Sequence, residues 1–143
     1  MSDLLNNEEI DSIKLEFPFG LLGFEDCKNF ILEKSEYKPF YWLQSEDKQL
    51  SFLVLDPFIC FSDYEVDVDD TVLSQIGITN AKDVLILTII TVPGGGKSIT
   101  ANLEGPLVIN RTNKKGLQAI LSDSRWTTKH EISPESVKGG KKC

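Results

Sequence analysis

The sequence predicts a mostly all-β domain, a compact antiparallel β-barrel-like fold with one short helix. Residues 84–92 form the most apolar run of the chain, are rich in β-branched side chains, and lead directly into Pro93 and three glycines. This composition favours a buried strand over a buried helix. Short apolar segments recur along the rest of the chain with turn-forming residues between them, which is typical of an antiparallel sandwich or barrel. At 143 residues, the chain is expected to form a single domain (1–143) with one core.

The central strand is expected to be buried on both faces. Val84, Ile86, Ile90 and Val92 would point to one side of an extended chain, and residues 85, 87 and 89 to the other. Both sets are apolar, so neither side suits water.

Before this strand, apolar residues alternate with polar ones or gather in short runs. In the first segment Ile13, Leu15 and Phe17 share one face, and Pro18 ends the pattern. The polar residues 45–49 predict a hairpin turn between the last two segments. The four predicted strands are residues 13–17, 30–32, 40–43 and 50–55.

Residues 64–69 alternate strictly between apolar and acidic side chains. An extended chain would turn Tyr64, Val66 and Val68 inward and leave Glu65, Asp67 and Asp69 about 7 Å apart on the other side. We therefore expect a strand with a negatively charged face. Two interpretations stay open: the carboxylates dock a basic partner, or they protect an edge strand from aggregation.

A short helix is predicted near residues 70–75. Asp69 or Asp70 can cap its first turn, and Gly77 suits the position just past its end. Three apolar residues share one side at helical spacing: Val72, Leu73 and Ile76. Further strands are expected at residues 98–103, 106–110 and 117–121, and the termini, residues 1–11 and about 134–143, are expected to be loose, with order near Trp126.

Composition excludes several classes of function. Cys27, Cys60 and Cys143 are widely scattered, and His130 is the single histidine, so neither a metal site nor a disulfide framework is indicated. The formal net charge is −7, with the acidic excess in residues 1–123, which disfavours direct nucleic-acid binding. With no export signal and no apolar run of membrane-spanning length, a cytoplasmic protein is expected.

Two motifs could carry chemistry, and we reject both. The turn around residues 94–96 is one residue short of a phosphate-binding loop, but strand-like sequence follows where that loop requires a helix. His130, Asp123 and a nearby serine could form a catalytic triad only in a specific geometry, and no strand-turn setting surrounds these serines. We therefore expect no catalytic residue and no cofactor, and His130 is expected to be solvated.

Three segments together resemble the FliW family of flagellar assembly factors. Residues 17–25 contain Pro18, Gly20 and Gly23; residues 53–57 end in Asp-Pro; and residues 100–110 contain Asn102, Pro106 and Asn110 and precede Gly116 and Gln118. The resemblance covers roughly residues 15–121. Leu22 departs from the family pattern, which commonly has Pro there, and Glu104-Gly105 replaces a more usual apolar-small pair.

The resemblance implies a non-enzymatic cytoplasmic protein that binds flagellin and the translational repressor CsrA. A shared pool of the factor would then couple flagellin synthesis to flagellin export. The acidic composition suits CsrA, because an RNA-binding surface must be basic. A small β-barrel enzyme and an oligonucleotide-binding barrel stay as alternatives.

Overall fold

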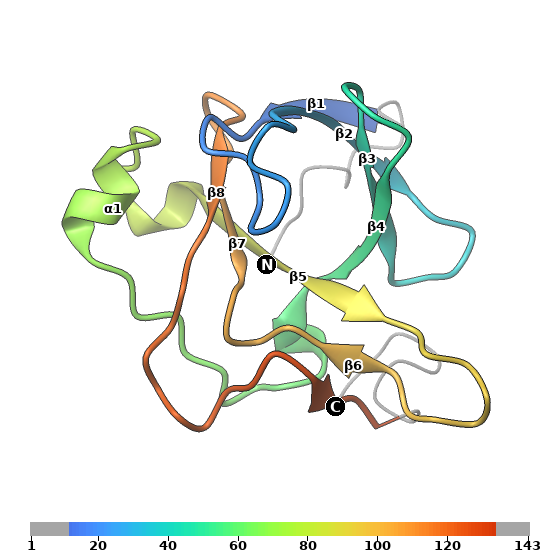
Figure 1. The fold of residues 1–143 in the computed structure, drawn as a ribbon. Coiled ribbons are helices and arrows are strands. Elements are labelled where there is room, and N and C mark those ends of the chain that lie inside the picture. The colour runs from blue at the N-terminus through green and yellow to red at the C-terminus, as the bar shows by residue number, and fades with distance from the viewer. Residues whose placement is uncertain (1–11, 134–143) are drawn as a thin grey trace.

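The computed structural model describes residues 12–133, so the expectations for residues 1–11 and 134–143 lie outside it. This part of the chain forms an antiparallel nine-stranded sheet with one short α-helix, α1 (Asp70–Ser74), and two 3₁₀ turns, η1 (Pro57–Ile59) and η2 (Ala81–Asp83) (Figure 1). The predicted all-β class is therefore confirmed. The strands are β1 (Ser12–Glu16), β2 (Asn29–Lys34), β3 (Tyr41–Ser45), β4 (Ser51–Leu55), β5 (Val84–Thr91), β6 (Thr100–Ala101), β7 (Leu107–Asn110), β8 (Gly116–Gln118) and β9 (His130–Glu131).

The sheet is organised around β5, which crosses the middle of the fold in Figure 1. One edge of β5 pairs with β4. The other edge pairs with β7 along its first half and with β6 at its end. The chain order β1-β2-β3-β4 continues through β5 to β6 and β9, and β8 extends the sheet beyond β7.

The sheet is not closed into a barrel, in contrast to the barrel-like closure that the sequence suggested. Within residues 12–133, one isolated bridge, between Glu16 and Lys115, joins β1 to the start of β8, with the Glu16 N–H donating to Lys114 O at 3.0 Å. Lys114, in the turn between β7 and β8, has a positive φ of 65°, which is uncommon for a residue other than glycine. A single bridge replaces the continuous ladder of a closed barrel.

The two faces of β5 contact two different hydrophobic clusters, as its sequence predicted. Ile86 and Ile90 pack with Tyr64, Trp126 and their neighbours. Leu85 and Leu87 pack into the second cluster, which lies under β1 to β4. Burial on both faces accounts for the mostly apolar sequence of this strand.

The ends of β5 depart from the expectation in detail. Val92 was expected to be buried but is 60% exposed, because β5 ends at Thr91. Thr88, the polar residue in the middle of the strand, is fully buried, and its hydroxyl donates to Leu55 O at 3.1 Å. The hydrogen bond satisfies a polar group that would otherwise be costly to bury.

Residues 64–69 do not form the predicted strand. The alternation of buried and exposed side chains is preserved, but the segment joins no ladder. Tyr64 is anchored by its hydroxyl, which donates to Leu103 O at 2.7 Å, and Val66 and Val68 are partly buried against the first cluster. Side-chain packing, not strand pairing, therefore holds this segment, and the interpretation as a protected edge strand is wrong.

The predicted helix is present where its signals placed it. α1 is followed by Gly77 with φ of 77°, as expected for a glycine just past a helix end. Asp69 occupies the N-cap position, yet its side chain makes no capping hydrogen bond. β6 and β8 are shorter than the predicted segments at residues 98–103 and 117–121, while β9 was not predicted. Trp126 is buried, which confirms the expected order at that point of the tail.

Candidate functional site

The first and third segments that carried the family resemblance meet in space through the side chain of Gln118. Its Nε2 donates to Gly105 O at 2.9 Å, and its Oε1 accepts from the backbone N–H of Leu22 at 2.9 Å. The Gly105 N–H in turn donates to Asn102 Oδ1 at 2.9 Å. A loop near the start of the chain and a turn near residue 104 are thus held against β8 by one amide group.

The loop at residues 17–25 folds back on itself. Gly20 and Gly23 both have positive φ, 69° and 85°, a region that residues with a Cβ rarely adopt. Leu21 and Phe24 exchange backbone hydrogen bonds of 3.3 and 2.7 Å. Leu21 is buried as a result, whereas Leu22 on the opposite side of the loop is 55% exposed.

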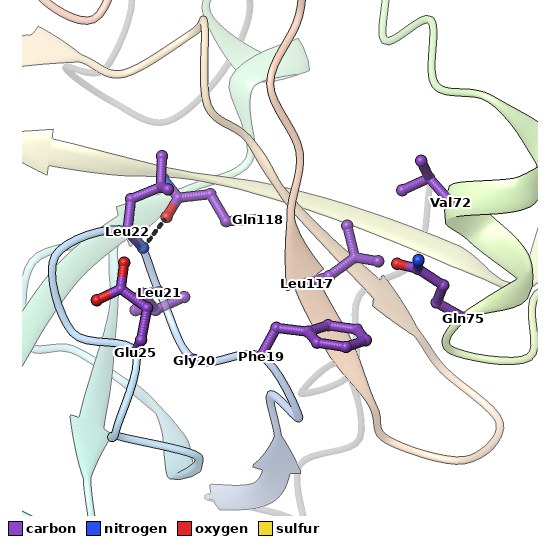
Figure 2. Close-up of a pocket in the computed structure, with 9 residues that line it drawn as sticks. All are labelled: Phe19, Gly20, Leu21, Leu22, Glu25, Val72, Gln75, Leu117 and Gln118. Carbon is purple, nitrogen blue, oxygen red and sulfur yellow. Dashed lines mark hydrogen bonds between the residues drawn. The ribbon is translucent and has the colours of Figure 1, made fainter.

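A small pocket with a volume of about 210 Å³ lies between this loop and α1 (Figure 2). Phe19, which is 54% exposed, extends from the loop toward Leu117 and Gln75, and Val72 of α1 lies on the far side. The pocket has one ionisable lining residue, Glu25, and the other side chains that line it are apolar or uncharged. Because most of its lining side chains are apolar, the pocket suits contact with an apolar group of another molecule. The sequence reasoning did not find this pocket, because exposure of Phe19 and Leu22 is not visible in the sequence.

The remaining motif residues make internal contacts. Asn110 is buried, donates from Nδ2 to Ile76 O at 2.9 Å, and accepts the Thr112 N–H on Oδ1 at 2.9 Å. It thereby links the end of β7 to the residues just after α1. Pro106 O accepts the N–H of Ala119 at 2.9 Å, which continues the β7–β8 pairing. These contacts lie inside the fold, and the structural role of the motif stays a prediction that substitution would test.

The second candidate surface is the acidic strip, formed by Glu65, Asp67 and Asp69. All three residues are exposed, as the alternation predicted. Arg125, which sequence reasoning missed, donates to Glu65 Oε1 at 2.9 Å and to Asp123 Oδ2 at 2.7 Å. Its guanidinium also lies 4.9 Å from the ring centre of Trp126. The negative charge of Glu65, at one end of the strip, is thus paired with Arg125. Within residues 12–133, no salt bridge reaches Asp67 or Asp69.

The rejected catalytic group is not assembled. Asp123 is hydrogen-bonded to Arg125, which holds the pKa of that carboxyl below its ordinary value. His130 packs edge-on against Phe61, with ring centres 5.2 Å apart, and also contacts Trp126. His130 is therefore half-buried in an aromatic cluster, and the expectation that it is simply solvated is wrong. Among residues 12–133, no three His, Cys, Asp or Glu side chains gather as metal ligands.

No helix in the part of the chain that the structure describes is long and apolar enough to cross a membrane.

Comparison with known proteins agrees on one family. The sequence model of the FliW protein family matches residues 4–132. Flagellar assembly factor FliW of Treponema denticola is 44% identical over 128 residues, covering 89% of this chain and 87% of that protein. The protein of the same name from Bacillus subtilis is 43% identical, with 84% and 85% covered. A crystal structure of the flagellar assembly factor FliW superposes with a TM-score of 0.78 at 39% identity, covering 87% of this chain and 88% of that one.

Proposed function

Because this chain belongs to the FliW family of flagellar assembly factors, we propose that it is a non-enzymatic cytoplasmic protein that binds flagellin and antagonises CsrA. When flagellin accumulates, it occupies the factor and leaves CsrA free to repress flagellin translation. When flagellin is exported, the released factor binds CsrA and lifts the repression. The protein would therefore couple the rate of synthesis to the rate of export.

The acidic strip is the observation that best supports a basic partner such as CsrA. Its carboxylates are exposed, and Tyr64 and Val66 on the opposite side of the same segment are fixed in the first cluster. Since the segment belongs to no strand ladder, its charge is not needed to block edge pairing. A fixed row of negative charge steers a positively charged partner toward it.

The family name of the relatives supports a role in flagellar assembly, and the exposed apolar lining of the small pocket supports a contact with a partner. Phe19 and Leu22 expose apolar area beside that pocket. An exposed apolar contact next to a polar rim is the usual composition of a protein interface.

Reconstitution tests this proposal directly. CsrA is mixed with a translation reporter that carries a flagellin leader, and the purified chain is added at increasing concentration. The expected result is relief of repression by the chain, followed by renewed repression when monomeric flagellin is added. If the chain binds neither flagellin nor CsrA in a calorimetric titration, the proposal is overturned.

A further inference from the structure

A second and larger pocket lies on the inner side of the acidic strip, with a volume of about 660 Å³. Its floor includes Ile86 of β5 and Val108 of β7. Val66 and Val68 line it from the segment that carries the acidic strip, and Leu73 lines it from α1. We refer to this pocket as the apolar groove. The same segment thus presents carboxylates outward and valines to the groove.

The groove leaves apolar surface open to a partner. Phe58, which also lines it, is 40% exposed, and Val66, Val68 and Leu73 are only partly buried. Its volume falls within the range of about 300–1,000 Å³ typical of ligand sites. Apolar surface of this kind gains free energy when another apolar group displaces its water.

Charge around the groove selects the kind of partner. Asp70 is the one ionisable residue in its lining, and Asp67 and Asp69 project from the adjoining segment. None of the lining residues is Lys or Arg. An acidic segment would be repelled here, whereas a segment with Lys or Arg beside its apolar residues would be attracted.

We propose that the apolar groove binds a protein segment whose apolar side chains fill the groove and whose flanking Lys or Arg side chains pair with Asp70 and are attracted by Asp67 and Asp69 on the outer side of the adjoining segment. The inference rests on the proposed function, because it assigns the site at which a protein partner of this factor is held. Burial of the apolar side chains supplies affinity, and the carboxylates set orientation and association rate. An amphipathic helix with apolar residues on one face has this chemistry.

The test uses two substitutions in the full chain. Ala81→Trp places a large side chain in the groove at an exposed lining position of η2. Asp70→Lys reverses the charge of the lining and serves as the second variant if Ala81→Trp does not fold. Ser51→Trp, at an exposed position that does not line the groove, is the matched control.

The probe is a short fluorescent peptide with Leu at helical spacing and Lys at the other positions, compared with a peptide in which Glu replaces Lys. The wild-type chain is expected to bind the Leu/Lys peptide at least roughly tenfold more tightly than the Leu/Glu peptide. Ala81→Trp and Asp70→Lys should each weaken Leu/Lys binding by roughly tenfold or more, with Ser51→Trp unchanged. Equal affinity of the wild-type chain and both groove variants for the Leu/Lys peptide would overturn the inference.

Parallel titrations with flagellin and CsrA separate this inference from the proposed function. If the wild-type chain binds either protein and both groove variants bind it equally well, the groove assignment fails and the proposed function stands. If the wild-type chain binds neither protein but binds the Leu/Lys peptide in a way that the variants abolish, the groove stands and the proposed function fails. If the two groove variants, but not the control variant, lose binding to flagellin or to CsrA, the result supports the groove assignment and the proposed function together.

Discussion

The backbone N–H of Leu22 donates a hydrogen bond to Gln118 Oε1 at 2.9 Å, although 96 positions separate the two residues. A Pro at position 22 would have no N–H to donate. This chain therefore holds the loop by a hydrogen bond, whereas Pro would restrict the backbone directly. The contact also places the exposed side chain of Leu22 beside the small pocket (Figure 2).

Gln118→Leu should destabilise the fold. The substitution removes hydrogen bonds to Leu22 N–H and to Gly105 O, and the part-buried carbonyl loses its partner. We expect a loss of about 1–3 kcal/mol in the free energy of unfolding, measured by urea denaturation. Gln75→Leu, at an exposed position of the same pocket, is the control and should change stability by less than about 0.5 kcal/mol. Equal stability of the two variants would show that the Gln118 contacts contribute nothing.

The two loop glycines should differ in their response to substitution. Gly23→Ala meets no heavy atom within 4 Å, so its cost is backbone strain alone, about 1–3 kcal/mol. A Cβ at Gly20 would lie 2.5 Å from Glu25 O, a contact with backbone that cannot move aside cheaply. Gly20→Ala should therefore lower the melting temperature further than Gly23→Ala. The reverse order would contradict the loop geometry.

The sequence predicted the central strand, both of its buried faces and the helix because the apolar residues of each recur at a regular spacing. The sequence could not predict that residues 64–69 stay outside the sheet. An alternation of apolar and acidic residues arises both in a strand of a sheet and in an unpaired segment whose apolar side chains, such as Val66, pack against a hydrophobic cluster. Pairing of distant residues is also invisible in one sequence. Arg125 carries no local signal that it would bond to Glu65, and Gln118 appeared as a motif position without a known contact.

Acid should destabilise the protein through a few specific carboxylates. The backbone N–H groups of Asn29 and Lys28 donate to Asp47 and hold its pKa below the ordinary value of 3.8, and the Lys48 ammonium does the same for Asp26. A lowered folded-state pKa contributes stability that is present above the unfolded value and is lost as pH falls through the folded one. The urea concentration at the midpoint of unfolding should therefore decrease when the pH is lowered below about 4.

Asp47→Asn tests this assignment. The variant should be less stable than wild type at pH 7 and should lose less stability between pH 5 and pH 3, because position 47 no longer takes up a proton. All other carboxylates are unchanged, so part of the acid dependence will remain. An acid dependence identical to that of wild type would mean that Asp47 makes no contribution.

Thr88→Val should also cost stability, although it makes β5 more apolar. The substitution preserves shape but removes the donor to Leu55 O in a fully buried position. The expected loss in the free energy of unfolding is about 0.5–1.5 kcal/mol by chemical denaturation. A variant as stable as wild type, or more stable, would show that the hydroxyl is replaceable by packing.

The central claim is that the acidic strip steers CsrA, and the triple variant Glu65→Gln, Asp67→Asn, Asp69→Asn isolates it. The substitutions keep side-chain size, and the lost ion pair to Arg125 is exposed at the surface, so folding should be little affected. Melting temperature is compared with wild type as the control.

The most direct measurement is the association rate of CsrA with the wild-type chain and the triple variant at low and at high salt. The account predicts slower association of the variant at low salt, a difference that shrinks as salt screens the charges, and an unchanged melting temperature. Association of the variant at the wild-type rate in low salt would contradict it.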